Sequence, residues 1–204
     1  MSTSVLNLVT QQLQGGALAD LSKQLGADEQ TTAKAVSTAL PVLLGALNNN
    51  ARQGDGANAL AGALQRDHDG SILDSLGGFF GGGNNSVSAG NAILKHVLGG
   101  SQRQSAEQGV GNIAGLNGGQ ASQLLALLAP VVLGALGKAQ RQEGLDAGAL
   151  SGLLGRESRA AGQAVPQAQG ILGSLLDQDG DGDVKDDVLR MGAGLLGSMF
   201  SGKR

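Results

Sequence analysis

An apolar octet occurs twice in this chain, and the repeat limits the folds that the whole sequence can adopt. Residues 40–47 read LPVLLGAL and residues 129–136 read APVVLGAL, so the two copies lie 89 positions apart. Flanking positions also match, with Gly26 corresponding to Gly115. Such self-similarity indicates a tandem repeat of one structural unit. We therefore expect an internal duplication into two modules, residues 1–83 and residues 84–204.

The residues available for a core favour helices over strands. The 204-residue chain contains 36 glycines and three phenylalanines, but no tryptophan, tyrosine or cysteine. Its core must then consist of leucine, valine, isoleucine and alanine, whereas sheets usually recruit more aromatic and β-branched residues. Apolar residues between Ala33 and Leu47 also recur at three- and four-residue spacing. The sequence predicts an all-α fold of two multi-helical modules, packed closely through glycine and alanine.

The boundaries of several elements follow from the same pattern. We expect helices over residues 5–13, 17–25 and 57–64. The helix that carries the first octet contains Pro41, which removes one backbone hydrogen bond, so we expect a kink or a break there. Residues 155–170 form an insertion in the second module. The low apolar content of this insertion indicates a mobile linker.

The most specific chemical pattern is an acidic loop near the C-terminus, residues 177–187. Three aspartates stand at alternate positions and Gly182 follows at once, as in the front half of an EF-hand calcium loop. Alternate side chains turn inward around a hard cation, and the glycine adopts a backbone conformation that a side chain would oppose. The predicted Ca²⁺ site consists of six aspartates: Asp177, Asp179, Asp181, Asp183, Asp186 and Asp187.

The end of this loop departs from the EF-hand motif. Position 12 is Val188 instead of a bidentate glutamate, so Asp186 or Asp187 would have to close the loop. At position 7, Asp183 would contribute its backbone carbonyl. The alternative interpretation is a solvated acidic turn whose aspartates cap the following helix.

A degenerate copy of the acidic loop ends the first module. Its glycine, Gly70, aligns with Gly182, and Ile72 aligns with the apolar Val184. Gln65 stands where the second copy has its first aspartate, so one carboxylate is lost. This copy is the weaker cation candidate, and its candidate ligands are Asp67, Asp69 and Asp74.

Other kinds of chemistry have little support in the sequence. The absence of cysteine excludes disulfides, thiolate metal sites and a cysteine nucleophile. The two histidines, His68 and His96, belong to no recognised catalytic arrangement, and we expect both to be surface residues. A net charge of −3 and the lack of aromatic stacking residues disfavour nucleic acid as a partner. We predict that the protein is not an enzyme.

The chain shows no targeting segment. Its first residues lack the basic region and long apolar run of a secretory signal. The apolar stretch at residues 124–137 is shorter than a membrane span and contains Pro130, which favours a buried helix. We therefore expect a cytoplasmic protein that does not span a membrane.

The segments on either side of the acidic loop suggest how it acts. Residues 171–176 and 188–200 would form a helix–loop–helix frame, but glycines weaken the second helix by up to ~1 kcal/mol each. This helix must pack against its own module, another copy of the chain or a protein partner. The leading hypothesis is a non-enzymatic structural or assembly protein whose C-terminal helices are ordered by a divalent cation. The alternatives are a small-molecule-binding helical protein or an enzyme with a pocket between the modules, and a membrane-surface protein.

Taken together, these motifs resemble a known family. The proline-centred octet, the run of alternating aspartates and glycines, and the Leu-Gly-rich tail are similar to those of the YidB-like bacterial proteins of uncharacterised function. The resemblance covers most of the chain. It implies an all-α fold in a bacterial protein and supplies no activity and no catalytic residues.

Overall fold

The structure is a computed structural model that describes residues 4–165 except Gly15 and Gly83, together with Ala168, Gly170, Ile171 and Gly173. Within this part of the chain there are nine α-helices, one 3₁₀ helix and no strand, so the predicted all-α fold is confirmed. In chain order, the elements are α1 (Val5–Leu13), α2 (Gly16–Leu25), α3 (Glu29–Arg52), α4 (Gly56–Asp67), η1 (Ser71–Ser75), α5 (Leu76–Gly81), α6 (Asn84–Val97), α7 (Gly100–Ala114), α8 (Gly118–Glu143) and α9 (Ala147–Ala164).

Polar caps explain where the three longest helices begin. The side chain of Asp28 accepts a hydrogen bond from the amide three residues later, at 2.8 Å, and Asp146 does the same for α9 at 2.7 Å. At the start of α8, Asn117 and Gln120 exchange side-chain and backbone hydrogen bonds in a capping box. These bonds satisfy amide donors that a helix leaves unpaired at its N-terminus.

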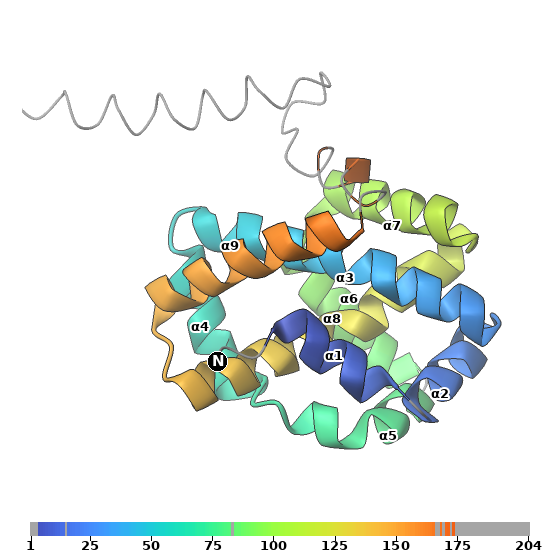
Figure 1. The fold of residues 1–204 in the computed structure, drawn as a ribbon, viewed down its shortest axis with the longest axis horizontal. Coiled ribbons are helices and arrows are strands. Elements are labelled where there is room, and N and C mark those ends of the chain that lie inside the picture. Colours follow the sequence, from blue (N-terminus) through green and yellow to red (C-terminus); the bar gives the residue numbers. More distant parts are fainter. Residues whose placement is uncertain are drawn as a thin grey trace, which may run out of the picture.

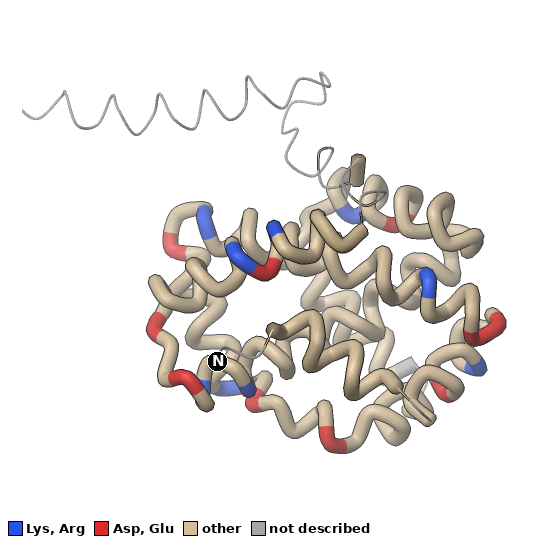
Figure 2. Tube along the Cα trace, viewed as in Figure 1, with Lys and Arg blue, Asp and Glu red and all other residues tan. Residues whose placement is uncertain are grey.

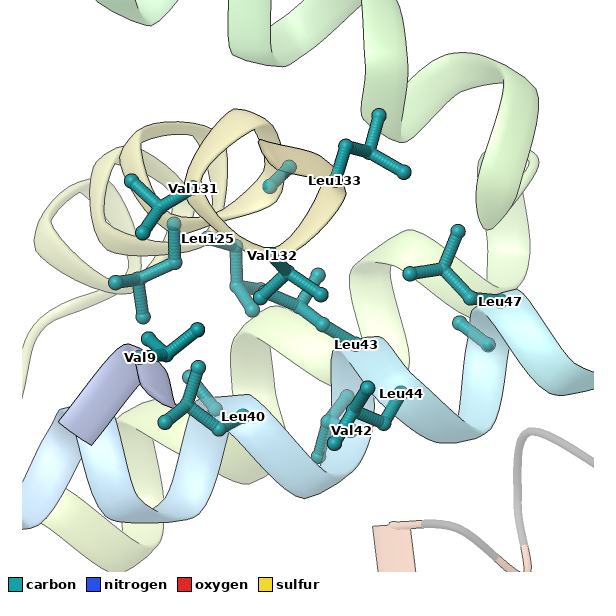
Figure 3. Close-up of a cluster of buried hydrophobic side chains, with 14 of the residues drawn as sticks. Val9, Leu40, Val42, Leu43, Leu44, Leu47, Leu125, Val131, Val132 and Leu133 are labelled. Atoms are coloured by element: carbon teal, nitrogen blue, oxygen red, sulfur yellow. The ribbon is translucent and has the colours of Figure 1, made fainter. Parts of the chain in front are cut away.

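Helices α3 and α8 cross the middle of the molecule, and the other helices pack around them (Figure 1). Helix α8 contacts α1, α4, α6 and α7, while α3 contacts α2, α4, α7 and α9 in addition to α8. Figure 3 shows Leu43 of α3 and Val132 of α8 between the two helices, and each is only 1% exposed. Buried residues from both sides of the predicted module boundary belong to one hydrophobic cluster.

Both octet prolines lie inside continuous helices. Helix α3 runs through Pro41 and α8 runs through Pro130, so the chain does not break at Pro41. Each proline is a buried residue of a helix that also buries many leucine, valine and alanine side chains, and the burial of this helix offsets the missing N–H. Tertiary packing therefore outweighs the local cost of the proline.

A close glycine contact covers the carbonyl that Pro130 leaves without a donor. Because proline has no N–H, the oxygen of Ala126, four residues earlier, lacks its helical hydrogen bond. Gly90 of α6 lies against this oxygen so closely that a Cβ on Gly90 would overlap it. The contact brings a Cα–H group to the open carbonyl, which is a weak but favourable interaction. Glycine is thus required here by the approach of α6 to α8.

Two further glycines let the chain approach α8. A Cβ on Gly134 would lie 2.5 Å from Cγ2 of Ile72, and a Cβ on Gly137 would overlap the carbonyl oxygen of His68. The segment between α4 and α5 can therefore lie directly on the backbone of α8. The predicted close packing through small residues occurs at these contacts.

The prediction of a mobile linker over residues 155–170 is wrong for residues 155–164. These residues continue α9 to its end at Ala164. Glu157 is 8% exposed and Ala161 is fully buried, and α9 packs along α3. A few well-placed small and polar residues are sufficient for this packing, which the low apolar content of the segment did not indicate.

Helix α8 is long and apolar enough to cross a membrane, but it is the core helix of this fold. Of its most apolar 18-residue window, 78% is buried inside the molecule. The expected buried helix at residues 124–137 is confirmed, because all of its residues lie inside α8 and are buried. Charged residues lie on the surrounding helices and loops and at the C-terminal end of α8 (Figure 2).

We predict that Gly90→Ala destabilises the protein by about 1–3 kcal/mol, because the new methyl group overlaps backbone and forces α6 away from α8. Chemical denaturation of the purified variant measures the change. Gly78→Ala is the matched control: Gly78 is an exposed residue of helix α5 with no atom near its would-be Cβ, so the variant should be neutral or stabilised by up to ~1 kcal/mol. Equal effects of the two substitutions would contradict the proposed contact.

Candidate functional site

The predicted Ca²⁺ loop lies outside the described residues. This holds for all six of its aspartates: Asp177, Asp179, Asp181, Asp183, Asp186 and Asp187. The last described positions before it are nevertheless informative. Ala168 is fully buried and Ile171 is 7% exposed. Ile171 packs on α7, where a Cβ on Gly109 would lie 2.5 Å from its Cγ1 atom. The chain is therefore attached to α7 six residues before the acidic loop begins.

The degenerate acidic loop of the first module forms a compact turn on α8. Gly70 has a φ of 94°, the left-handed conformation expected for the glycine of the motif. Asp69 accepts a hydrogen bond from the amide of Ser71 at 3.0 Å, and Ile72 packs against Gly134 of α8. The glycine and the apolar residue of the motif therefore shape and anchor the turn.

The carboxylates of this first loop do not gather around a common point. Asp67, Asp69 and Asp74 are all exposed, and the described residues contain no group of three His, Cys, Asp or Glu side chains that could hold a metal ion. Instead, Asp69 lies 3.6 Å from the guanidinium of Arg141 on α8. Hydrogen bonds from Ser71, and to a smaller extent the charge of Arg141, hold the pKa of Asp69 below its usual value. The geometry gives the weaker cation candidate no support.

The two histidines differ in their surroundings. His96 is exposed at the end of α6, as expected, and its Nδ1 lies 2.9 Å from the carbonyl oxygen of Ala92. His68 is half-buried between α4 and α8 instead of lying fully on the surface. Burial lowers the pKa of His68, and the charge of neighbouring Asp67 opposes this effect only in part.

Sequence reasoning missed a buried carboxylate, Glu157 of α9. Its Oε2 accepts hydrogen bonds from the hydroxyl of Ser4 at 2.9 Å and from the amide of Leu6 at 3.1 Å. Helix α1 has no acidic residue in its own first turn, so Glu157 supplies the negative charge that the N-terminus of a helix favours. The two partners are about 150 positions apart in the chain, and no local pattern in the sequence marks the pair.

A polar cleft of about 250 Å³ lies where the end of α3 meets the junction of α6 and α7. We call it the α3–α7 cleft. Its polar lining residues are Asn49, Asn50, Gln53, Lys95, His96 and Gln102. The Nδ2 atom of Asn50 donates to the carbonyl of His96 at 3.2 Å and joins the two walls. The cleft therefore lies between residues of the predicted first module and residues of the second.

The sequence profile of a family described as "Bacterial protein of unknown function (DUF937)" matches residues 7–139, about two thirds of the chain. The chain belongs to this family. YidB is also a member, so the resemblance to YidB-like proteins is confirmed. The match to DUF937 includes α2 to α7, most of α1 and the greater part of α8, and ends before α9 and the acidic C-terminal loop. No curated protein and no solved structure matches the chain.

We predict that the stability of this DUF937 protein falls as the pH drops from neutral through about 6.5, the ordinary pKa of histidine. Because the folded state lowers the pKa of His68, the unfolded state takes up a proton first, and this contribution to stability is lost at lower pH. Melting curves between pH 7.5 and pH 5 measure the loss. His68→Asn should flatten the dependence, whereas His96→Asn is the control that should leave it intact. The same dependence in all three proteins would contradict the assignment.

We further predict that Glu157→Ala loosens α1. The substitution leaves the Ser4 hydroxyl and the Leu6 amide without their partner, at a cost of about 1–3 kcal/mol. Hydrogen exchange should show faster exchange of the amides of α1, while those of α8 change little. Glu143→Ala, at the exposed end of α8, is the matched control. Unchanged exchange in α1 of the Glu157 variant would rule out this role.

Proposed function

We propose that the protein is a non-enzymatic structural or assembly protein in which a divalent cation, Ca²⁺, orders the C-terminal helices. The cation would bind the acidic loop at residues 177–187, with Asp177, Asp179 and Asp181 as side-chain ligands and Asp186 or Asp187 closing the site. Ca²⁺ prefers a shell of several oxygen ligands, which this density of carboxylates can supply. Binding to the ordered state alone would stabilise that state.

The geometry of the first acidic loop is the observation that carries the proposal. There, Gly70 adopts the left-handed conformation and Ile72 anchors the turn on a helix of the other half of the chain. The second loop has Gly182 and Val184 at the corresponding positions, and it carries six aspartates over residues 177–187 where the first loop has three over residues 65–75. The turn alone leaves the three carboxylates of the first loop apart, so the proposal depends on the additional aspartates of the second loop, Asp177, Asp183 and Asp187, to complete a cation site.

The proposed internal duplication also has support in the fold. Asp28 and Asn117, which cap α3 and α8, are 89 positions apart, the same offset as the two octets. Contacts between the halves are crosswise, since α9 packs on α3 while α4 packs on α8. Each half thus places the helix that follows its own central helix against the central helix of the other half. A duplication would explain why each acidic segment comes after a helix that packs across the molecule.

The attachment of the chain at Ile171 supports the proposed assembly role. Because Ile171 packs on α7, a cation bound from Asp177 onward would act close to the body of the protein. Ordering of the Leu-Gly-rich segment after the loop would present an apolar helix face to a second copy or to a protein partner. Self-association is therefore expected to depend on calcium.

Thermal unfolding with and without calcium tests the proposal. At a calcium concentration 100 times Kd, the wild-type protein should gain about 2.7 kcal/mol of stability if the cation binds only the folded state. The double variant Asp179→Asn/Asp181→Asn should lose this gain. The matched control, Asp69→Asn/Asp74→Asn, removes carboxylates of the first loop and should keep it. A calcium effect that survives in the first variant would refute the assignment of the site.

A further inference from the structure

The α3–α7 cleft has a lining that suits an acidic occupant. It contains Lys95 and His96 and no carboxylate. The side chains of Asn49, Gln53 and Lys95 make no hydrogen bond or ion pair within the described part of the chain. Nδ1 of His96 lies 2.9 Å from the carbonyl oxygen of Ala92, so that contact leaves Nε2 as the other ring nitrogen available for a hydrogen bond.

The start of α7 adds to this electrostatic character. Helix α7 begins at Gly100, after Gly99 in the cleft wall, and has no side-chain cap and no acidic residue in its first turn. The positive end of its dipole is therefore not neutralised locally. The nearest carboxylate on α7, Glu107, is paired with Arg103 at 2.7 Å. Arg103 also donates to Asn91 and Ser122, so this ion pair is held away from the cleft.

The chain itself supplies an acidic segment within reach. Ile171 packs at Gly109, seven residues after the cleft residue Gln102 and therefore on the same side of α7, about 10 Å along the helix. The six residues from Ile171 to Asp177 can span up to about 20 Å. The segment that follows, residues 177–187, carries six aspartates and one lysine. The cleft lies within the range of the most acidic part of the protein.

The first half of the molecule contains a corresponding contact. The first acidic segment lies on the C-terminal half of α8, where Asp69 pairs with Arg141 and the guanidinium of Arg141 donates to the carbonyl of Gln65 at 3.2 Å. Under the proposed duplication, Arg141 and Gln142 correspond to Arg52 and Gln53. These residues end α3, and Gln53 lines the cleft. The equivalent position for the second acidic segment is thus the α3–α7 cleft.

We propose that the α3–α7 cleft is the docking site of the chain's own acidic segment, residues 177–187. The carboxylates face Lys95 and the start of α7, and the amides of Asn49 and Gln53 donate to them. This docking rests on the acidic segment and on the duplication, but it needs no bound cation. Docking would give the C-terminal acidic loop a defined position against the helices of the protein.

Disulfide trapping tests the docking in the full-length chain, which has no cysteine of its own. One variant carries Gln53→Cys with Asp183→Cys. Its matched control carries Lys34→Cys with Asp183→Cys, because Lys34 is exposed on the same helix, 19 residues or about 28 Å from Gln53. Circular dichroism and gel filtration verify that both variants are folded and that the trapped species is one chain. The reaction is run in chelator, so that a failure of calcium binding does not affect the result.

If the acidic segment docks in the cleft, the disulfide of the Gln53→Cys/Asp183→Cys variant (the cleft pair) should form at least about ten times faster than the disulfide of the control variant (the control pair). The reason is that docking raises the effective concentration of the two thiols. Adding Lys95→Glu should slow the cleft pair severalfold, and high salt should do the same. Equal rates for the two pairs, or a cleft pair insensitive to Lys95→Glu, would overturn the proposal. The cleft would then be open to a small polar ligand instead.

Discussion

The contact between α3 and α8 is the interaction on which the rest of this fold depends. The two helices carry the repeated octets, and their leucine and valine side chains form the centre of the core (Figure 3). Without large aromatic residues, this core gains its stability from close approach, and each buried leucine or valine contributes about 1.5–3 kcal/mol relative to exposure. Glycines at three contacts, Gly90 of α6 and Gly134 and Gly137 of α8, let neighbouring backbone or side chains lie directly against α8. Gly90 also lies against the carbonyl oxygen of Ala126, which lacks its helical hydrogen bond because residue 130 is proline, so the two residues act together at the contact of α6 and α8.

The local parts of this structure could be predicted from the sequence, and the long-range parts could not. Periodicity placed α1, α2 and α4 closely and identified the buried centre of α8, because these features depend on neighbouring residues. The continuity of α3 through Pro41 and the helical course of residues 155–164 depend on packing against other helices. The bond between Glu157 and the start of α1 joins residues about 150 positions apart, so local patterns could not reveal it.

The two acidic segments show how one sequence pattern can serve different ends. In the first, Arg141 stands beside Asp69, and its guanidinium provides the positive charge that a bound ion would supply. The second segment has six aspartates and only Lys185 among them, so its carboxylates repel one another more strongly than those of the first segment. A divalent cation and the basic lining of the α3–α7 cleft are two ways to balance this negative charge. If the cation stays bound at all times, the loop would have a structural role in this DUF937 protein. If cation binding and docking in the cleft exclude each other, the loop would have a regulatory role.

A calorimetric titration of calcium into the chelator-treated full-length protein, with magnesium as the control, measures whether residues 177–187 bind a cation. We expect saturable binding of about one calcium ion, with much weaker binding of magnesium, since Ca²⁺ accepts six to eight oxygen ligands in adaptable geometry whereas Mg²⁺ gives up its water molecules reluctantly. If millimolar calcium gives no heat of binding, residues 177–187 are an acidic turn and the proposed cation-dependent function is wrong.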